Sequence, residues 1–156
     1  CGGVGACLRS SDRLNESSMI SSLPFEALQQ MLEALPIRIF WKDRESRFLG
    51  CNQLFAQDAG IEDPREFVGR SDFYFYHPEQ AEAFRYIDAE VMHSGQPRLN
   101  YRERLTLVNG QTRWLETNKL PLRGPGGEVI GIIGMYQDIT DRRRCEEIER
   151  KMALGA

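Results

Sequence analysis

The chain has 156 residues, enough for one domain with a hydrophobic core and some flanking sequence. Its formal net charge of -3 argues against nucleic-acid binding, which needs a basic face. No apolar run approaches the roughly 20 residues that span a bilayer, so we expect no membrane contact by this segment. Because the chain starts with Cys1 instead of Met, we expect it to be a piece of a longer protein.

The cysteine pattern indicates neither a structural zinc site nor a disulfide framework. Cys1, Cys7, Cys51 and Cys145 form no Cys-x-x-Cys pair, and the chain has only two histidines. Scattered thiols fit a reducing compartment, so the predicted location is cytoplasmic, and the parent protein is free to carry a membrane anchor elsewhere. A disulfide between the first two cysteines stays open as an alternative.

The first half of the chain reads as a leader, a helix, two strands and short helices. Residues 1–23 are rich in Gly and Ser and are predicted to be a flexible leader or linker. Apolar residues at helical spacing predict a helix over 24–35, ended by Pro36. Strands are expected at 37–42 and 47–50, joined by a turn at 43–46. Asn52 is a good N-cap for the short helix that follows.

The second half predicts one long helix and three strands. The longest helix is expected over 78–94, with Gly95 as its terminator. Alternating patterns predict strands at 98–107, 112–122 and 129–138. Asn109-Gly110 and the Gly124–Gly127 segment supply the two turns between them. A charged helix is expected from residue 139 almost to the end of the chain.

This order of elements resembles a PAS sensor domain. The motifs that carry the resemblance are Phe40–Asp43, Phe48–Asn52, Val68–Phe73, Ser94–Pro97, Asn109-Gly110 and Gly131–Thr140. The resemblance implies an α+β fold: a five-stranded antiparallel sheet, helices inserted between strands two and three, and flanking helices at both ends. It divides the chain into a leader (1–23), a PAS domain (24–138) and an exit helix (139–156). The pattern is most similar to PAS domains of bacterial sensor histidine kinases and diguanylate cyclases.

Two known chemistries of this family lack their key residue here. Light-oxygen-voltage domains carry a reactive cysteine after a Gly-Arg pair, and Asp72 stands at that position behind Gly69-Arg70. Haem-binding members place an axial histidine in the long helix, near the position that Phe84 occupies. We therefore expect neither a cysteinyl-flavin nor haem, and the cofactor, if there is one, stays open. His77 and His93 are interpreted as helix-end residues, with pH sensing as the alternative.

The resemblance implies a cavity between the sheet and the long helix. Residues expected to line a ligand pocket are Trp41, Phe55, Phe73, Phe84, Ile87, Tyr101, Glu103, Leu115, Lys119 and Tyr136. Core packing is the alternative role for the aromatic members. A buried carboxylate is costly unless paired, so Glu103 and Lys119 are expected to pair with each other or with a ligand. An exposed edge or a structural salt bridge is the alternative, because the strand at 112–122 has apolar residues on both faces.

The junction before the exit helix is predicted to relay a signal. Asp138 or Thr140 can cap this helix, and the family couples strand movement to the helix here. Ile139, Cys145, Ile148 and Met152 form a sparse apolar set that fits the start of a two-helix coiled coil. We therefore expect a homodimer, with the leading helix packed on the sheet or on a second copy.

The sequence contains no Gly-x-Ser-x-Gly motif, no Gly-x-x-x-x-Gly-Lys phosphate-binding loop and no His-Glu-x-x-His motif. The predicted function is therefore non-enzymatic: a sensory input module of a signal-transduction protein. It would bind a small ligand or a partner and pass its state to an output domain in the same chain. The alternatives are a PAS domain without ligand that serves dimerisation and spacing, and a transcription-regulator PAS that binds a protein partner.

Overall fold

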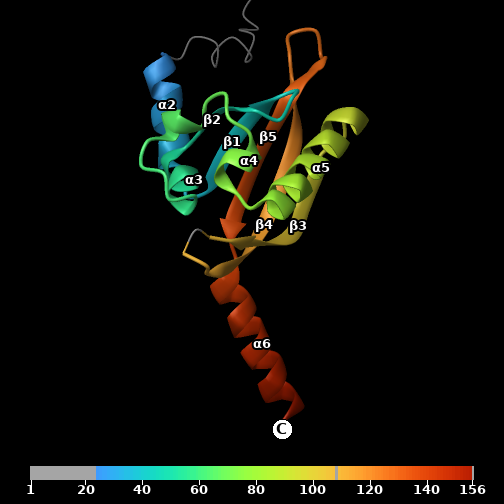
Figure 1. Ribbon diagram of the computed structural model, residues 1–156. Helices are drawn as coiled ribbons and strands as arrows, with labels where there is room; N and C mark the ends of the chain where they lie inside the picture. The colour runs from blue at the N-terminus through green and yellow to red at the C-terminus, as the bar shows by residue number, and fades with distance from the viewer. Residues whose placement is uncertain (1–23, 108, 156) are drawn as a thin grey trace, which may run out of the picture.

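A five-stranded antiparallel sheet organises the molecule. The structure is a computed structural model that describes residues 24–107 and 109–155; the predicted leader, with Cys1 and Cys7, lies outside them. The strands are β1 (Arg38–Asp43), β2 (Phe48–Cys51), β3 (Arg98–Thr106), β4 (Thr112–Arg123) and β5 (Val129–Asp138). Their order in the sheet is β2-β1-β5-β4-β3 (Figure 1). The first and last strands of the chain are therefore neighbours, and β5 lies at the centre.

Short helices and one long helix lie between β2 and β3. The helical segments are α2 (Phe25–Ala34), α3 (Gln53–Asp58), the 3-10 helix η1 (Pro64–Phe67), α4 (Asp72–Phe75), α5 (Pro78–Ser94) and α6 (Thr140–Leu154). The helices inserted between β2 and β3 cover one face of the sheet, whereas α6 leads away from its lower end (Figure 1). The predicted α+β fold class is confirmed. Within the described residues, no helix has the length and apolar character needed to cross a membrane.

The bounds of α5 follow from its terminal residues. Pro78 occupies the first helical position, where a missing N–H removes no hydrogen bond. Gly95 has a left-handed conformation with φ 66°, and its N–H donates to the carbonyl of Val91. Glycine adopts this conformation without the steric cost that a Cβ brings. The predicted range 78–94 is therefore the observed helix.

Asn52 connects three elements at one end of the sheet. Its Oδ1 accepts hydrogen bonds from the N–H of Phe55 at 3.2 Å, as an N-cap of α3, and from the N–H of Ile39 in β1 at 3.1 Å. Its Nδ2 donates to the carbonyls of Ile37 at 2.8 Å and Leu32 at 3.3 Å. The predicted N-cap thus also anchors the end of α2 and the start of β1.

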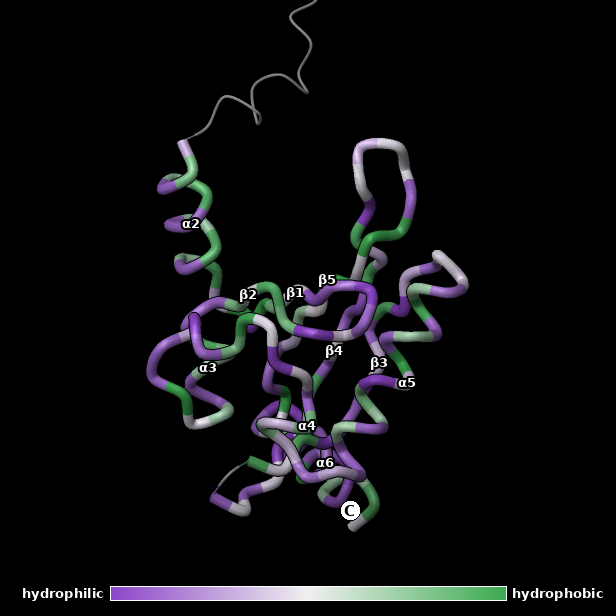
Figure 2. Tube along the Cα trace, turned by 45° about the horizontal axis from the view of Figure 1, so that its top comes forward, coloured by the Kyte–Doolittle hydropathy of each residue, from purple (hydrophilic) through white to green (hydrophobic). Residues whose placement is uncertain are grey.

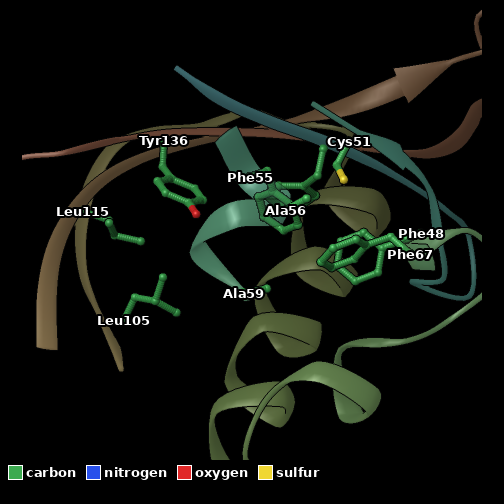
Figure 3. Packing of buried hydrophobic residues seen from close by; sticks show 10 residues of the cluster. Phe48, Cys51, Phe55, Ala56, Ala59, Phe67, Leu105, Leu115 and Tyr136 are labelled. Atoms are coloured by element: carbon green, nitrogen blue, oxygen red, sulfur yellow. The ribbon is translucent and has the colours of Figure 1, made fainter. Parts of the chain in front are cut away.

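The hydrophobic core lies between the sheet and the inserted helices (Figure 3). Four phenylalanines dominate it, Phe40, Phe48, Phe55 and Phe67, with ring centroids 4.9–5.9 Å apart in the contacting pairs. Gly134 of β5 makes room for this layer, since a Cβ there would collide with the Phe40 ring. Aromatic packing, not a single large aliphatic layer, therefore sets the spacing between sheet and helices.

The two flanking helices bury no residue in the described chain. α2 exposes Phe25, Leu28, Met31 and Leu35, and it projects away from the sheet (Figure 2). α6 exposes Ile148 and Met152. The packing of the leading helix on its own sheet, one of the two arrangements expected from the sequence, does not occur.

Candidate functional site

Four buried charged side chains form the polar centre of the molecule. The Nζ of Lys42 lies 2.7 Å from Asp72 Oδ2 and 2.8 Å from Asp88 Oδ2. The Nζ of Lys119 lies 2.6 Å from Asp88 Oδ1. All four side chains are at most 2% exposed. We call Lys42, Asp72, Asp88 and Lys119 the buried ionic cluster; its two positive and two negative side chains balance.

The cluster joins four elements that are distant in the sequence. Lys42 comes from β1 and Lys119 from β4, on the covered face of the sheet, whereas Asp72 begins α4 and Asp88 lies in the middle of α5. Lys42 shares the inner face of β1 with Phe40, two residues earlier. Lys119 also donates to the carbonyl of Phe84 at 3.3 Å, and the hydroxyl of Ser46 donates to Asp88 at 3.3 Å. The cluster therefore holds α4 and α5 to the sheet.

The pKa values of the two aspartates are shifted in opposite directions, although burial acts to raise both. Desolvation would raise the pKa of Asp88, but the ammonium groups of Lys119 and Lys42 outweigh it, so the pKa of Asp88 lies below its ordinary value. Burial raises the pKa of Asp72, and its contact with Lys42 compensates only in part. Asp88, which bridges both lysines, is therefore the strongly held anion of the cluster.

A cavity of about 30 Å³ lies beside the cluster, between the sheet, α4 and α5. Its walls are Phe40, Lys42, Phe48, Phe55, Asp72, Tyr76, Phe84, Glu103, Leu105, Leu115, Lys119 and Tyr136. Half of these twelve residues are aromatic, and Lys42, Asp72, Glu103 and Lys119 supply the charged groups. A concave apolar space with a few placed polar groups is the usual form of a small-molecule site.

Glu103 and Lys119 both line the cavity, but they do not pair with each other. Glu103 Oε1 accepts a hydrogen bond from the hydroxyl of Thr117 at 2.8 Å, whereas Lys119 pairs with Asp88. The reason is register: Glu103 stands opposite Leu115 across β3 and β4, which places Lys119 four residues further along its strand. Burial raises the pKa of Glu103, and the nearby Lys119 and the Thr117 hydrogen bond only moderate this rise.

The structure brings six of the ten predicted pocket residues to the cavity wall: Phe55, Phe84, Glu103, Leu115, Lys119 and Tyr136. Trp41 does not reach the wall, because alternation along β1 puts it on the opposite face from Phe40 and Lys42. Its ring there covers Gly50, its partner in β2.

Three further predicted pocket residues also lie away from the cavity wall. Phe73 is exposed on α4, with the Arg85 guanidinium 5.5 Å from its ring centroid. Ile87 is half-buried on α5 without lining the cavity. Tyr101 packs its ring 4.6 Å from the Arg98 guanidinium, and its buried hydroxyl has no hydrogen-bond partner among the described residues.

Sequence reasoning missed Lys42, Asp72 and Asp88 as partners. The one local signal is that Lys42 shares the parity of Phe40, although Arg38 in the same strand has this parity too. In the sequence, Asp72 stands out only as the residue that replaces a reactive cysteine, and Asp88 lies in a helix rich in carboxylates. Asp72 and Asp88 lie 30 and 46 residues after Lys42, and contacts over such separations produce no periodic pattern in the sequence. In the described part of the chain, no group of three His, Cys, Asp or Glu side chains could hold a metal ion.

The base of α6 is attached to the opposite face of β4. The N–H of Trp114 donates to Thr140 Oγ1 at 3.0 Å, and the Trp114 ring lies 3.6 Å from the Arg143 guanidinium. Asp138 accepts from the N–H of Thr140 at 2.9 Å and pairs with Arg113 at 2.9 Å. Of the two residues expected to cap α6, Asp138 accepts the hydrogen bond from the first N–H of the helix. The Thr140 hydroxyl accepts from the N–H of Trp114 in β4 and does not cap the helix. β4 therefore has two sets of contacts. Leu115 and Lys119 of this strand line the cavity, and Trp114 of the same strand contacts α6.

The sequence model of the PAS fold family matches residues 32–144. The chain therefore belongs to the PAS family. Among curated proteins it is 27% identical over 120 residues to the aerobic respiration control sensor protein ArcB of Escherichia coli. It is 29% identical over 122 residues to a diguanylate cyclase of Vibrio cholerae. These matches cover 77% and 75% of this chain, but only 15% and 36% of the length of the relatives.

Solved structures of PAS proteins have the same fold. The Vibrio cholerae VqmA dimer matches with a TM-score of 0.69 at 26% identity, over 77% of this chain and 53% of VqmA. The PAS domain of Bordetella pertussis BvgS matches with a TM-score of 0.62 at 23% identity, over 84% and 97% of the two chains. These similarities identify a PAS domain of the kind found in sensor proteins and diguanylate cyclases.

Proposed function

We propose that this PAS domain is the sensory input module of a larger cytoplasmic signalling protein, a sensor histidine kinase of a two-component system or a related protein. The module, residues 24–138, would bind a small molecule in the cavity and bias the exit helix, residues 139–156. The observation that carries this proposal is the buried ionic cluster beside an aromatic cavity. Burying four charges is expensive, and apolar residues of similar volume would stabilise a merely structural core at least as well.

The charges around the cavity favour an uncharged polar ligand. The buried ionic cluster is balanced, and the raised pKa of Glu103 favours its neutral form. An anion would find both lysines already paired, and a cation would find a Glu103 carboxyl whose ionisation is disfavoured by burial. A small molecule with a polar edge for Lys119 and Glu103 and an apolar body for the aromatic wall fits best. One solved relative is described as VqmA bound to DPO, which is consistent with a small ligand in this type of domain.

The relay would run through β4. Leu115 and Lys119 contact the cavity from one face of this strand, and Trp114 holds the base of α6 on the other. A ligand that favours one arrangement of sheet and α5 would shift the population of α6 orientations. Asp138 and Thr140 are the proposed relay residues, and the module itself catalyses no reaction.

A second candidate function is a scaffold without ligand that serves dimerisation and domain spacing. It is favoured by the cavity volume of about 30 Å³, which holds little more than one water molecule. The exposed apolar positions on α2 support dimerisation in either case, and VqmA is described as a dimer.

Native mass spectrometry of the purified chain tests the first function against the second. We expect a retained molecule or, after screening uncharged metabolites by thermal shift, a stabilised complex that Lys119→Met weakens by about tenfold or more. Lys151→Met on the exposed side of α6 is the matched control and should bind like the parent chain. An empty protein that no member of the panel stabilises would favour the scaffold function.

A further inference from the structure

A second pocket lies directly outside the cavity. It has a volume of about 270 Å³ and lies between the end of α3, the start of α5 and the end of β3. Ala59, His77, Gln80 and Leu107 contribute to its walls. Tyr76 lines both this outer pocket and the inner cavity, and no other residue is common to the two. Tyr76 therefore lies where the two spaces meet, and the hydrogen bond at 2.8 Å from the Tyr136 hydroxyl, on the inner wall, to Asp58, on the outer wall, closes the boundary beside it.

The volumes make this separation important. Sites for small molecules usually have volumes of about 300–1,000 Å³. The inner cavity alone is about a tenth of this size, but the inner and outer spaces together reach the lower end of the range. A ligand that reaches Lys119 and Glu103 therefore needs the Tyr76 ring to move aside.

Tyr76 stands at a place in the fold where such movement is possible. It follows α4 as its C-cap, with extended φ -123° and ψ 157°, and only His77 separates it from Pro78, the first residue of α5. Its N–H donates to the carbonyl of Asp72 at 2.9 Å, so the backbone is tied to the buried ionic cluster. The ring is held by an edge contact with Phe84, with centroids 5.3 Å apart. The backbone is thus anchored, while rotation of the ring breaks no regular secondary structure.

The remaining walls of the cavity are less able to open. Phe40, Lys42, Leu115 and Tyr136 belong to the three central strands of the sheet, where ladder hydrogen bonds fix the backbone. Asp72 is held by its ion pair with Lys42. The backbone of these strand residues cannot move without breaking ladder bonds, and Asp72 and Lys42 cannot move apart without breaking a buried ion pair.

We propose that the ring of Tyr76 is the gate through which a small uncharged molecule enters the cavity from the outer pocket. This inference rests on the proposed ligand-binding function for its purpose, but its test does not require a ligand. With the gate open, the outer pocket receives the apolar body of the molecule and the inner cavity its polar edge. Tyr76 is then a selectivity residue, since the size of its ring limits what enters.

Accessibility of an engineered thiol tests the gate. Leu115→Cys places a thiol on the inner cavity wall at a position that is 2% exposed. The probe is methyl methanethiosulfonate, a small neutral reagent that forms a mixed disulfide with the thiol and releases methanesulfinate. Peptide mass spectrometry follows each cysteine separately. Adding Tyr76→Ala should raise the modification rate at position 115 by about tenfold or more, whereas Tyr76→Phe should keep the slow rate of Leu115→Cys alone.

Two internal controls separate gating from loosening of the fold. Cys51 is buried in the core away from the cavity wall, and its modification rate reports opening of the whole domain. Tyr74→Ala removes an exposed ring from α4, the short helix that Tyr76 caps, and the modification rate of the thiol at position 115 should stay slow in this variant. The proposal is overturned if Tyr76→Ala leaves the rate unchanged, if Tyr74→Ala accelerates it equally, or if Cys51 accelerates in parallel. A working gate in a chain that retains no small molecule would contradict the proposed sensing and not the gate.

Discussion

At the scale of single residues, Asp88 is the central group of the buried ionic cluster. It is fully buried and contacts both lysines, whereas Asp72 contacts only Lys42. Removing one partner of a buried ion pair is costly because the other charge stays buried without compensation. The two aspartates therefore differ in importance although both are almost completely buried.

Asp88→Asn is expected to lower the free energy of unfolding by about 3–5 kcal/mol, because both lysines lose their shared carboxylate. Asp72→Asn should cost less, about 1–3 kcal/mol, because Lys42 keeps Asp88 and burial already disfavours the Asp72 carboxylate. Urea unfolding at neutral pH measures both values. Glu90→Gln, an exposed change on the same helix, is the control and should stay within about 0.5 kcal/mol of the parent. Equal losses for the two aspartates would contradict the central role of Asp88.

Glu103 makes stability depend on pH. Its pKa is raised in the folded chain, so the folded state binds the proton more tightly than the unfolded state, whose pKa is close to 4.5. Its contribution therefore favours folding most below this value and is lost as the pH rises through the raised pKa. Glu103→Gln keeps an acceptor for Thr117 but cannot ionise.

Relative to Glu103→Gln, the parent chain should lose stability as the pH is raised from 4.5, and the difference should level off above the folded pKa. The loss should be about 1.4 kcal/mol for each pH unit that separates the folded pKa from the unfolded one. Urea unfolding of both proteins, from about pH 4 to about pH 8, measures it. Glu149→Gln, an exposed change on α6, is the control: its free energy of unfolding should change with pH as that of the parent chain does. A constant difference across the range would contradict the raised pKa.

At the scale of elements, β4 is the strand that faces both functional regions. Alternation along the strand sends Leu115, Thr117 and Lys119 toward the helices, while Trp114 and Glu116 hold α6. The contacts with α6 are polar: a hydrogen bond to Thr140, the Arg143 guanidinium on the Trp114 ring, and an Arg142–Glu116 pair at 2.9 Å. Since α6 buries no residue, these contacts at its base, not a hydrophobic seam, determine its direction.

Thr140→Val is expected to loosen the base of α6 without unfolding the domain. The substitution keeps the shape of the side chain but removes the acceptor for the Trp114 N–H, a loss of about 1 kcal/mol. Hydrogen exchange should accelerate at Trp114 and over 140–144, by about fivefold for that free energy. Thr112→Val, an exposed change on the same strand, should not alter exchange at α6. Unchanged protection at Trp114 would show that the hydroxyl does not hold the helix.

At the scale of the whole molecule, the helices at the two ends of the described chain, α2 and α6, bury none of their residues. α2 has ten residues and buries none, and isolated helices of that length are marginal in water. Its apolar side chains Leu28 and Met31 share one face, and the C-cap residue Leu35 is exposed as well. We expect a second copy to cover α2, and Ile148 and Met152 of α6 have a spacing that a coiled coil uses.

Met31→Glu is expected to weaken dimerisation by about 30-fold or more, because a carboxylate would be buried in an apolar contact. Sedimentation equilibrium over a concentration series measures the change. Gln29→Glu places the same charge on the polar side of α2 and should leave the dimer intact. A parent chain that stays monomeric at all concentrations would contradict the proposed dimer.

Local chemistry made most of the secondary structure predictable. Pro78 and Gly95 bound α5, Asn52 caps α3, and the strand at 129–138 is the observed β5. The face of the sheet on which a side chain lies was less predictable where a strand has apolar residues on both faces. The sequence pattern predicts Trp41 in the pocket, but the pleat of β1 turns it outward, because Phe40 and Lys42 take the inner face.

The elements, their order and the resemblance to the family could be predicted from the amino-acid sequence, because caps, turn residues and periodicity act over a few neighbouring residues. The sequence also indicated Glu103, on the apolar face of its strand by parity, and Lys119 as candidate partners of each other or of a ligand. The pairing of Lys119 with Asp88, the completion of the cluster by Asp72 and Lys42, and the position of Tyr76 on the walls of both pockets became visible only in the folded chain. The physical reason is that ion pairing and cavity shape depend on side chains from β1, β4, α4 and α5 meeting in space, and spacing along one element does not encode contacts between elements.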